Sequence, residues 1–154
     1  MNKWRRFRRL SVSERRILLR SLFLLALTSA ALHTIGYRRW KLFLARFTAQ
    51  NNSTAPLTPE SLHSARRIAR MVAAASEEGI FHGKCLEQSI VLWWFLLRRR
   101  MPAELQIGGR RTSAGFEAHA WVEIAGIVVN DRDVVSQDFA PFGGNTASAD
   151  VDHR

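Results

Sequence analysis

A cysteine, a histidine and an aspartate occur along this chain in an order that could support nucleophilic catalysis. Cys85 is the only cysteine, and it stands where the glycine-containing stretch 79–84 gives way to an apolar run at 86–97. A thiol at a helix start loses its proton more easily, because the helix dipole stabilises negative charge there, and Lys84 adds a neighbouring positive charge. His119 lies in a predicted strand, and Asp131 follows after a turn. Cysteine, histidine and aspartate are the nucleophile, base and orienting group of a Cys-His-Asp hydrolase. The competing interpretation is that Cys85 is a small, inert residue of the core.

The spacing of His119 and Asp131 is typical of neighbours in a hairpin. The pattern predicts two strands, at 116–124 and 127–131. A three-residue loop with Gly126 in the left-handed position would pair His119 directly with Asp131, within reach of a hydrogen bond. A two-residue loop would oppose Arg132 to His119 and turn Asp131 to the other face. The glycine favours the three-residue loop.

Composition indicates one globular domain that needs no metal or cofactor. The chain has 154 residues, of which 47% are hydrophobic and 10% aromatic, enough for a modest core. One cysteine excludes an intramolecular disulfide, and no Cys/His cluster has the spacing of a metal site. We therefore expect no metal and no cofactor, and a reducing, cytoplasmic location.

The positive charge is concentrated near the N-terminus. The net charge is +10, and residues 1–50 hold twelve of the 23 Lys and Arg residues but one of the 13 acids, Glu14. Such a region can bind an acidic partner, an anionic membrane or nucleic acid, or remain a solvated arm. Ser11 and Glu14 have capping-box spacing and predict a helix from Val12 that carries the apolar stretch 17–35. Arg20 and His33 interrupt that stretch, so a segment that spans the membrane or is cleaved as a signal peptide is the least favoured interpretation. Packing on the core of this protein or of a partner is favoured most, and peripheral membrane contact comes second.

Four segments are expected along the chain: a basic, hydrophobic helical region at 1–50, a linker at 51–57, a catalytic domain at 58–142 and a flexible tail at 143–154. Within the catalytic domain we predict a helix from Thr58-Pro59 that Gly79 ends, and a central, buried helix from Cys85 to Leu97. A strand at 103–107, a basic loop at 108–115 and the His119 hairpin follow. Two helices followed by three antiparallel strands predict an α+β fold. The tryptophans are expected in the core: Trp93, Trp94 and Trp121.

Several motifs together resemble a known family. They are Gly83-Lys-Cys85-Leu-Glu-Gln-Ser89, Arg99-Arg-Met-Pro102, Ala118-His-Ala-Trp-Val-Glu123 with Asn130-Asp131, and Phe139-Ala-Pro-Phe142. Over residues 57–142 the chain is similar to the transglutaminase-like leader peptidases of lasso-peptide biosynthesis. The resemblance implies a papain-like cysteine protease with Cys85, His119 and Asp131 as its triad, which removes the leader from a ribosomally made precursor peptide. It gives no catalytic role to Lys84, Glu87 or Gln88.

The resemblance also implies partners, namely a small leader-recognition protein and an ATP-dependent cyclase that closes the macrolactam ring. Nothing before residue 57 resembles the leader-recognition module of fused family members, so we expect the split form. Residues 1–50 are then a docking surface for these proteins, with peripheral membrane contact as an alternative and no nucleic acid expected. Two other functions remain open: a transglutaminase-fold acyltransferase, and a non-catalytic basic adaptor with an inert Cys85.

Overall fold

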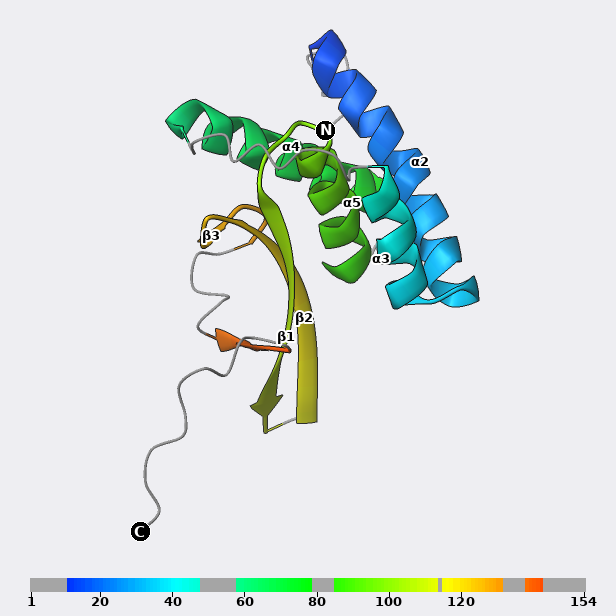
Figure 1. Ribbon diagram of the computed structural model, residues 1–154, viewed down its shortest axis with the longest axis vertical. Coiled ribbons are helices and arrows are strands. Elements are labelled where there is room, and N and C mark those ends of the chain that lie inside the picture. Colours follow the sequence, from blue (N-terminus) through cyan, green and yellow to red (C-terminus); the bar gives the residue numbers. More distant parts are fainter. Residues whose placement is uncertain (1–10, 48–57, 79–84, 114, 132–137, 143–154) are drawn as a thin grey trace.

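The computed structural model describes residues 11–47, 58–78, 85–113, 115–131 and 138–142 (Figure 1). Within these residues four helices precede a small antiparallel sheet, and its strand order is β3-β2-β1-β4. The helices are α2 (Val12–Thr34), α3 (Tyr37–Arg46), α4 (Pro59–Glu78) and α5 (Cys85–Leu97), and the strands are β1 (Ala103–Thr112), β2 (Gly115–Ile124), β3 (Ile127–Val128) and β4 (Ala140–Pro141). The predicted α+β class is confirmed. The expected linker at 51–57, the stretch 79–84 and the expected tail at 143–154 lie outside the described residues.

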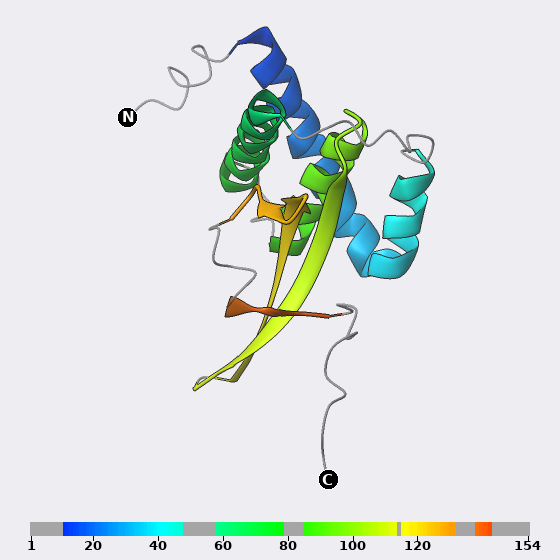
Figure 2. The same cartoon turned by 60° about the vertical axis from the view of Figure 1, so that its left-hand side comes forward.

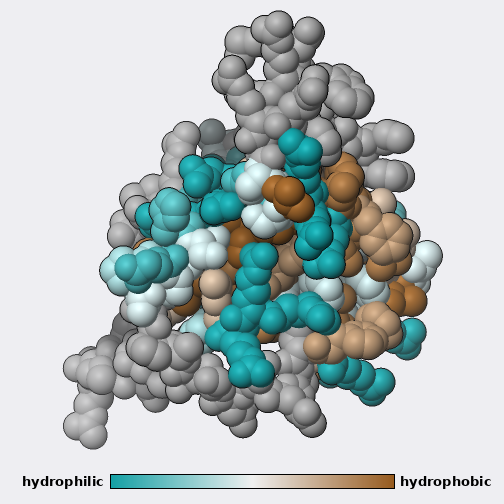
Figure 3. All heavy atoms as spheres, turned by 90° about the horizontal axis from the view of Figure 1, so that it is seen from above, coloured by the Kyte–Doolittle hydropathy of each residue, from teal (hydrophilic) through white to brown (hydrophobic). Residues whose placement is uncertain are grey.

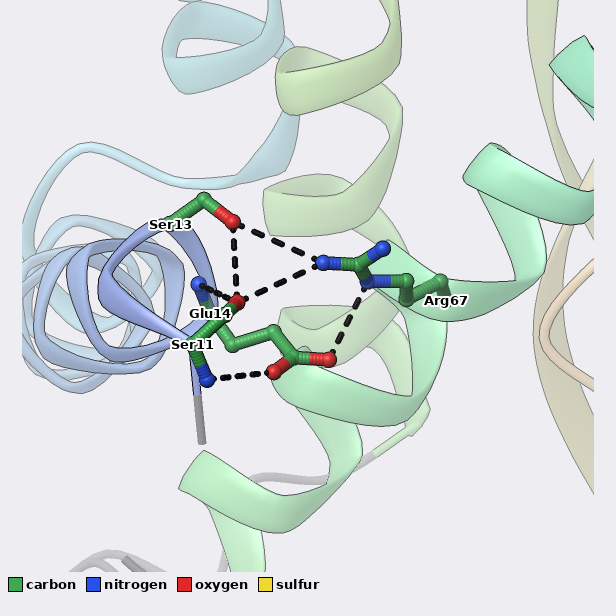
Figure 4. Close-up of polar contacts among 4 residues, drawn as sticks. All are labelled: Ser11, Ser13, Glu14 and Arg67. Carbon is green, nitrogen blue, oxygen red and sulfur yellow. Dashed lines mark hydrogen bonds and ion pairs between the residues drawn. The ribbon is translucent and has the colours of Figure 1, made fainter. Parts of the chain in front are cut away.

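Helix α2 begins at the predicted capping box. The Glu14 N–H donates to Ser11 Oγ (3.2 Å), and the Ser11 N–H donates to Glu14 Oε2 (2.8 Å). Arg67 on α4 forms an ion pair with the other Glu14 oxygen (3.1 Å), so the same carboxylate caps α2 and ties it to α4 (Figure 4). The hydrogen bonds from Ser11, followed by the Arg67 charge, lower the pKa of Glu14.

One hydrophobic core joins the N-terminal helices to the rest of the fold. Helix α5 is buried on almost every side, as its apolar sequence predicts. Helix α2 packs against α4 and α5 through one stripe, which includes Ile17, Leu25 and Ala31. The Trp40 indole N–H on α3 donates to Thr28 on α2 (3.3 Å). The apolar stretch 17–35 therefore packs on this protein's own core along one face.

Strand β1 is longer than predicted, because the expected basic loop at 108–115 is largely strand. β1 continues to Thr112 and pairs with β2 along its whole length, and the resulting ribbon extends well beyond the helices (Figure 2). Gly108 and Gly109 are present for close approach rather than for a turn. A Cβ at Gly108 would lie 2.8 Å from the Ala140 carbonyl oxygen on β4, and one at Gly109 would lie 2.3 Å from the Phe116 ring. The prediction also missed β4, which makes the sheet four-stranded.

The hairpin register differs from the favoured prediction. Glu123 pairs with Val128 and Ile124 with Ile127, so the loop contains two residues rather than three. Ala125 (φ 50°) and Gly126 (φ 77°) both have positive φ, as in a type I′ turn, whose twist matches the strands it joins. The prediction was wrong because it gave the left-handed conformation to the glycine alone.

Candidate active site

His119 and Asp131 are in direct contact even though their strands have the other register. His119 Nε2 lies 2.5 Å from Asp131 Oδ2, and the two side chains are 24% and 30% exposed. Strand β3 ends at Val128, one further backbone hydrogen bond joins the Val129 N–H to the Val122 carbonyl (3.0 Å), and the chain bends over residues 129–131. Strand alternation therefore no longer applies at Asp131, which reaches the histidine from a bend. With the carboxylate at Nε2, Nδ1 becomes the ring nitrogen that can accept a proton from a thiol.

A buried polar network fixes this bend to helix α5. Asn130 Oδ1 accepts a hydrogen bond from the Val122 N–H on β2 (2.8 Å), and its Nδ2 donates to Ser89 Oγ on α5 (3.0 Å). The Ser89 hydroxyl donates to the Ala120 carbonyl on β2 (2.9 Å). Beyond the end of β3, the side chains of Ser89 and Asn130 thus bind the backbone groups of β2 that a neighbouring strand would otherwise bind. This arrangement ties Ala120 and Asn130, the sequence neighbours of His119 and Asp131, to α5.

Cys85 is the first residue of α5 and is partly exposed. Ser89 follows it by four residues, so the two side chains lie on the same face of the helix, the face that meets the edge of β2. Among the described residues, no hydrogen bond joins the Cys85 thiol to His119. Catalytic hydrogen bonds are often long before substrate binds. The structure therefore brings His119 and Asp131 into contact and places Cys85 one turn ahead of the residue that binds the strand of His119.

Aromatic rings border the histidine on the face of the sheet away from α5. The His119 ring lies against Phe139 (centroids 5.2 Å apart) and is nearly parallel to Trp121 (6.3 Å, 18°). The Arg110 guanidinium on β1 lies over the Phe139 ring, 4.5 Å from its centroid, and also forms an ion pair with Glu117 (2.8 Å). These contacts restrict the rotation of the imidazole, which a positioned base requires.

A groove adjoins the His119–Asp131 pair on its α4 side. Its volume is about 610 Å³, within the range of ligand-binding clefts. One wall consists of α4 side chains and the other of the bend after β3; the lining residues are His63, Arg66, Ala69, Arg70, Ala73, Val129, Asn130 and Asp131. Helix α4 and β3 lie side by side in both ribbon views (Figures 1 and 2). The groove is open to solvent and contains the carboxylate that binds His119.

Sequence reasoning found the His119–Asp131 pair but missed the residues that position it. Ser89 is completely buried, and a buried hydroxyl needs a hydrogen-bond partner, so a serine directly before the apolar run at 90–97 was a usable signal. No comparable signal identified Asn130, because its role depends on where β3 stops. Gln88, which had no assigned role, donates to Ser76 on α4 (2.9 Å) and helps to join the two helices.

Comparisons with known proteins give one match. A model of the transglutaminase-like superfamily matches residues 25–143, which covers the second half of α2 and every element after it. Comparison with curated proteins and with solved structures gave no match.

Proposed function

The chain belongs to the transglutaminase-like superfamily, which has the fold of cysteine proteases and acyltransferases, and on that premise we propose that it is a cysteine peptidase. Its proposed substrate is the precursor of a lasso peptide, from which it removes the leader. One observation carries the proposal: His119 and Asp131 are hydrogen-bonded beside a helix that begins with the only cysteine of the chain. The motifs shared with lasso leader peptidases support the choice of substrate.

In the proposed mechanism His119 accepts the Cys85 proton at Nδ1, and the thiolate attacks the carbonyl carbon of the leader's last residue. The bond from sulfur to carbon forms, the C–N bond breaks, and the imidazolium returns its proton to the leaving amine. Water then hydrolyses the thioester to release the leader as a free acid. Asp131 orients the imidazole and stabilises its positive charge, and the Cys85 backbone N–H at the helix start is a donor for the oxyanion.

The proposed partners are a separate leader-recognition protein and a lasso cyclase. The surface of the N-terminal helices suits docking, because one exposed stripe on α2 is apolar and includes Leu19, Phe23 and Leu27. Seen from above, hydrophobic surface gathers on the right-hand side, where α2 and α3 lie in Figure 1, and hydrophilic side chains gather toward the centre and left (Figure 3). This exposed apolar stripe supports a contact with a partner protein.

Peripheral membrane contact through the same helices is the alternative. Helix α2 is long and apolar enough to cross a membrane, but core helices and signal sequences share these properties. Two assays distinguish membrane contact from protein contact: sedimentation with anionic and neutral vesicles, and a pull-down with the recognition protein and the cyclase. Binding to vesicles but to neither protein, with loss of binding at high salt, would support peripheral membrane contact.

An acyltransferase remains the second candidate function, since the superfamily fold also suits acyl transfer to an amine. The product distinguishes the two reactions. Hydrolysis of a precursor gives a free leader acid, whereas transfer gives an amide of different mass. Neighbouring open reading frames for a short precursor, a cyclase and a small recognition protein would support the peptidase.

The test is cleavage of that precursor by the purified protein with its recognition partner, followed by mass spectrometry. Cys85→Ala and His119→Ala should each abolish cleavage, since both belong to one catalytic unit. His33→Ala is the matched control, because that histidine is exposed on α2 and bonds to the Ser29 carbonyl. Cleavage by Cys85→Ala at a rate near that of the unmodified protein would exclude the cysteine-peptidase mechanism.

A further inference from the structure

A cleft lies between the first half of α2 and the end of α5. Its volume is about 680 Å³, within the range of ligand-binding clefts, and none of its lining residues belongs to the candidate active site. Three of them are arginines, namely Arg20, Arg98 and Arg99, and the others are apolar or aromatic. Leu19 and Phe23, which are 56% and 68% exposed, also belong to the apolar stripe on α2. The cleft therefore combines positive charge with apolar surface and is continuous with that stripe.

The positive charges of the cleft act on one another. Partial burial lowers the pKa of Arg99, and the charges of Arg67 and Arg20 lower it further. Arg67 already has a carboxylate partner, whereas neither Arg20 nor Arg99 forms an ion pair within the part of the chain that the structure describes. The segments that precede α2 and α5, at 1–10 and 79–84, contain no acidic residue. An anion bound at Arg20 and Arg99 would therefore relieve this repulsion.

Arg98 is held in place beside Arg99. Its guanidinium lies over the Trp94 ring, 5.1 Å from the centroid. Carbonyl groups at the end of α5 accept backbone hydrogen bonds, Trp94 from the Arg98 N–H (3.0 Å) and Leu96 from the Arg99 N–H (2.9 Å). The helix end adds only a partial negative charge. Because a guanidinium stacked on a ring keeps its N–H donors and loses little further rotamer freedom on binding, Arg98 is a pre-positioned donor for an anion in the cleft.

We propose that this cleft is an anchor site for a partner protein, and that it binds a segment in which an apolar side chain neighbours a carboxylate. The carboxylate binds Arg20 and Arg99 through charge-assisted hydrogen bonds, for which a guanidinium provides paired donors. The apolar side chain packs against Phe23 and Phe95. A side chain that protrudes from a protein reaches a concave site, whereas the flat headgroup layer of a membrane meets convex surfaces. The inference deepens the proposed docking surface and rests on it, but it does not depend on peptide cleavage.

The first experiment selects ligands without a known partner. A displayed library of random dodecapeptides is panned against the immobilised protein, after removal of peptides that bind the Arg20→Gln/Arg99→Gln double variant. Selected peptides are compared by fluorescence anisotropy with counterparts in which each carboxylate becomes an amide or each apolar side chain becomes alanine. We expect both replacements to weaken binding about tenfold, which corresponds to the loss of one charge-assisted hydrogen bond or of one buried apolar side chain. A selection without acidic residues would overturn the proposal.

Single replacements test the location. Arg20→Gln and Phe23→Ala should each weaken the binding of a selected peptide about tenfold. Arg111→Gln and Phe116→Ala are the matched controls, because both residues are exposed on the β1–β2 ribbon and lie outside the cleft. Circular dichroism verifies that each variant is folded, and in the unmodified protein the indole N–H signal of Trp94 should shift in an NMR titration with the peptide. Equal losses in the cleft and control variants, or an unchanged Trp94 signal, would refute the site.

Two further measurements separate this inference from its alternatives. Sedimentation with phosphatidylserine vesicles that Arg20→Gln abolishes and Arg111→Gln preserves would assign the cleft to an anionic lipid and overturn a protein partner. Precursor cleavage with the recognition partner tests the peptidase, and a KM raised about tenfold in Arg20→Gln at unchanged kcat supports both proposals. Peptide binding in the cleft without any precursor cleavage retains the anchor site and refutes the peptidase. Cleavage together with peptide binding that Arg20→Gln leaves unchanged refutes the anchor site alone.

Discussion

Ser89→Ala should destabilise the protein strongly for so small a change. The hydroxyl is completely buried, donates to the Ala120 carbonyl (2.9 Å) and accepts from Asn130 Nδ2 (3.0 Å). The substitution removes both hydrogen bonds and leaves a carbonyl and an amide without these partners. A buried polar group left unpaired costs about 1–3 kcal/mol, so two such groups should lower the free energy of unfolding by about 2–6 kcal/mol. In a chain of this length that corresponds to a melting temperature lower by the order of 10 °C.

Ser21→Ala is a matched control within the same chain. Ser21 is also completely buried, but its Oγ has no hydrogen-bond partner among the described residues. Its removal should therefore leave the free energy of unfolding unchanged or raise it slightly, because no hydrogen bond is lost and a buried hydroxyl is replaced by a methyl group.

The assay is thermal and urea unfolding of both variants, followed by circular dichroism, together with the cleavage rate below the melting temperature. Ser89→Ala should also reduce that rate, because the network fixes the strand that carries His119 against the helix that begins at Cys85. Equal melting temperatures for the two alanine variants would refute the reasoning. If the Ser89→Ala protein does not fold, Ser89→Thr is the variant to compare, because it keeps the hydroxyl.

Three further predictions concern the candidate site, the cap of α2 and the hairpin turn. Asp131→Asn should lower the rate of precursor cleavage about tenfold or more, because an amide can orient the imidazole but cannot stabilise its charge; an unchanged rate constant would remove Asp131 from the site. Glu14→Gln should lower the melting temperature at neutral pH. Because the folded pKa of Glu14 is lowered, its contribution is present above the ordinary value of 4.5 and is lost as the pH falls through the lowered value, so the melting curves of variant and unmodified protein should converge in acid. Ala125→Gly should raise the free energy of unfolding by about 1 kcal/mol, since a positive φ of 50° is strained for alanine, and urea unfolding would show the opposite sign if the two-residue turn were wrong.

The helices were predictable from sequence because their signals are local. The capping box at Ser11 and Glu14 set the start of α2, and Thr58-Pro59 set the start of α4, where Thr58 Oγ1 accepts from the Ser61 N–H (3.2 Å). The apolar composition of 86–97 predicted a buried α5. Hydrophobic periodicity and caps act within a few residues, so they can be read without the partner elements.

The sequence by itself therefore determined the class of the fold and the bounds of its main helices, and it predicts nucleophilic chemistry at Cys85, His119 and Asp131. Only the tertiary structure decided how two of them meet. The two-residue turn would have carried Asp131 to the wrong face if β3 had continued, but the strand stops and Asn130 and Ser89 take over the edge of β2. That outcome depends on hydrogen bonds between residues about 40 positions apart in the sequence, which local pattern does not encode. The same holds for Gly108, whose place in β1 follows from the approach of β4 rather than from any tendency to turn.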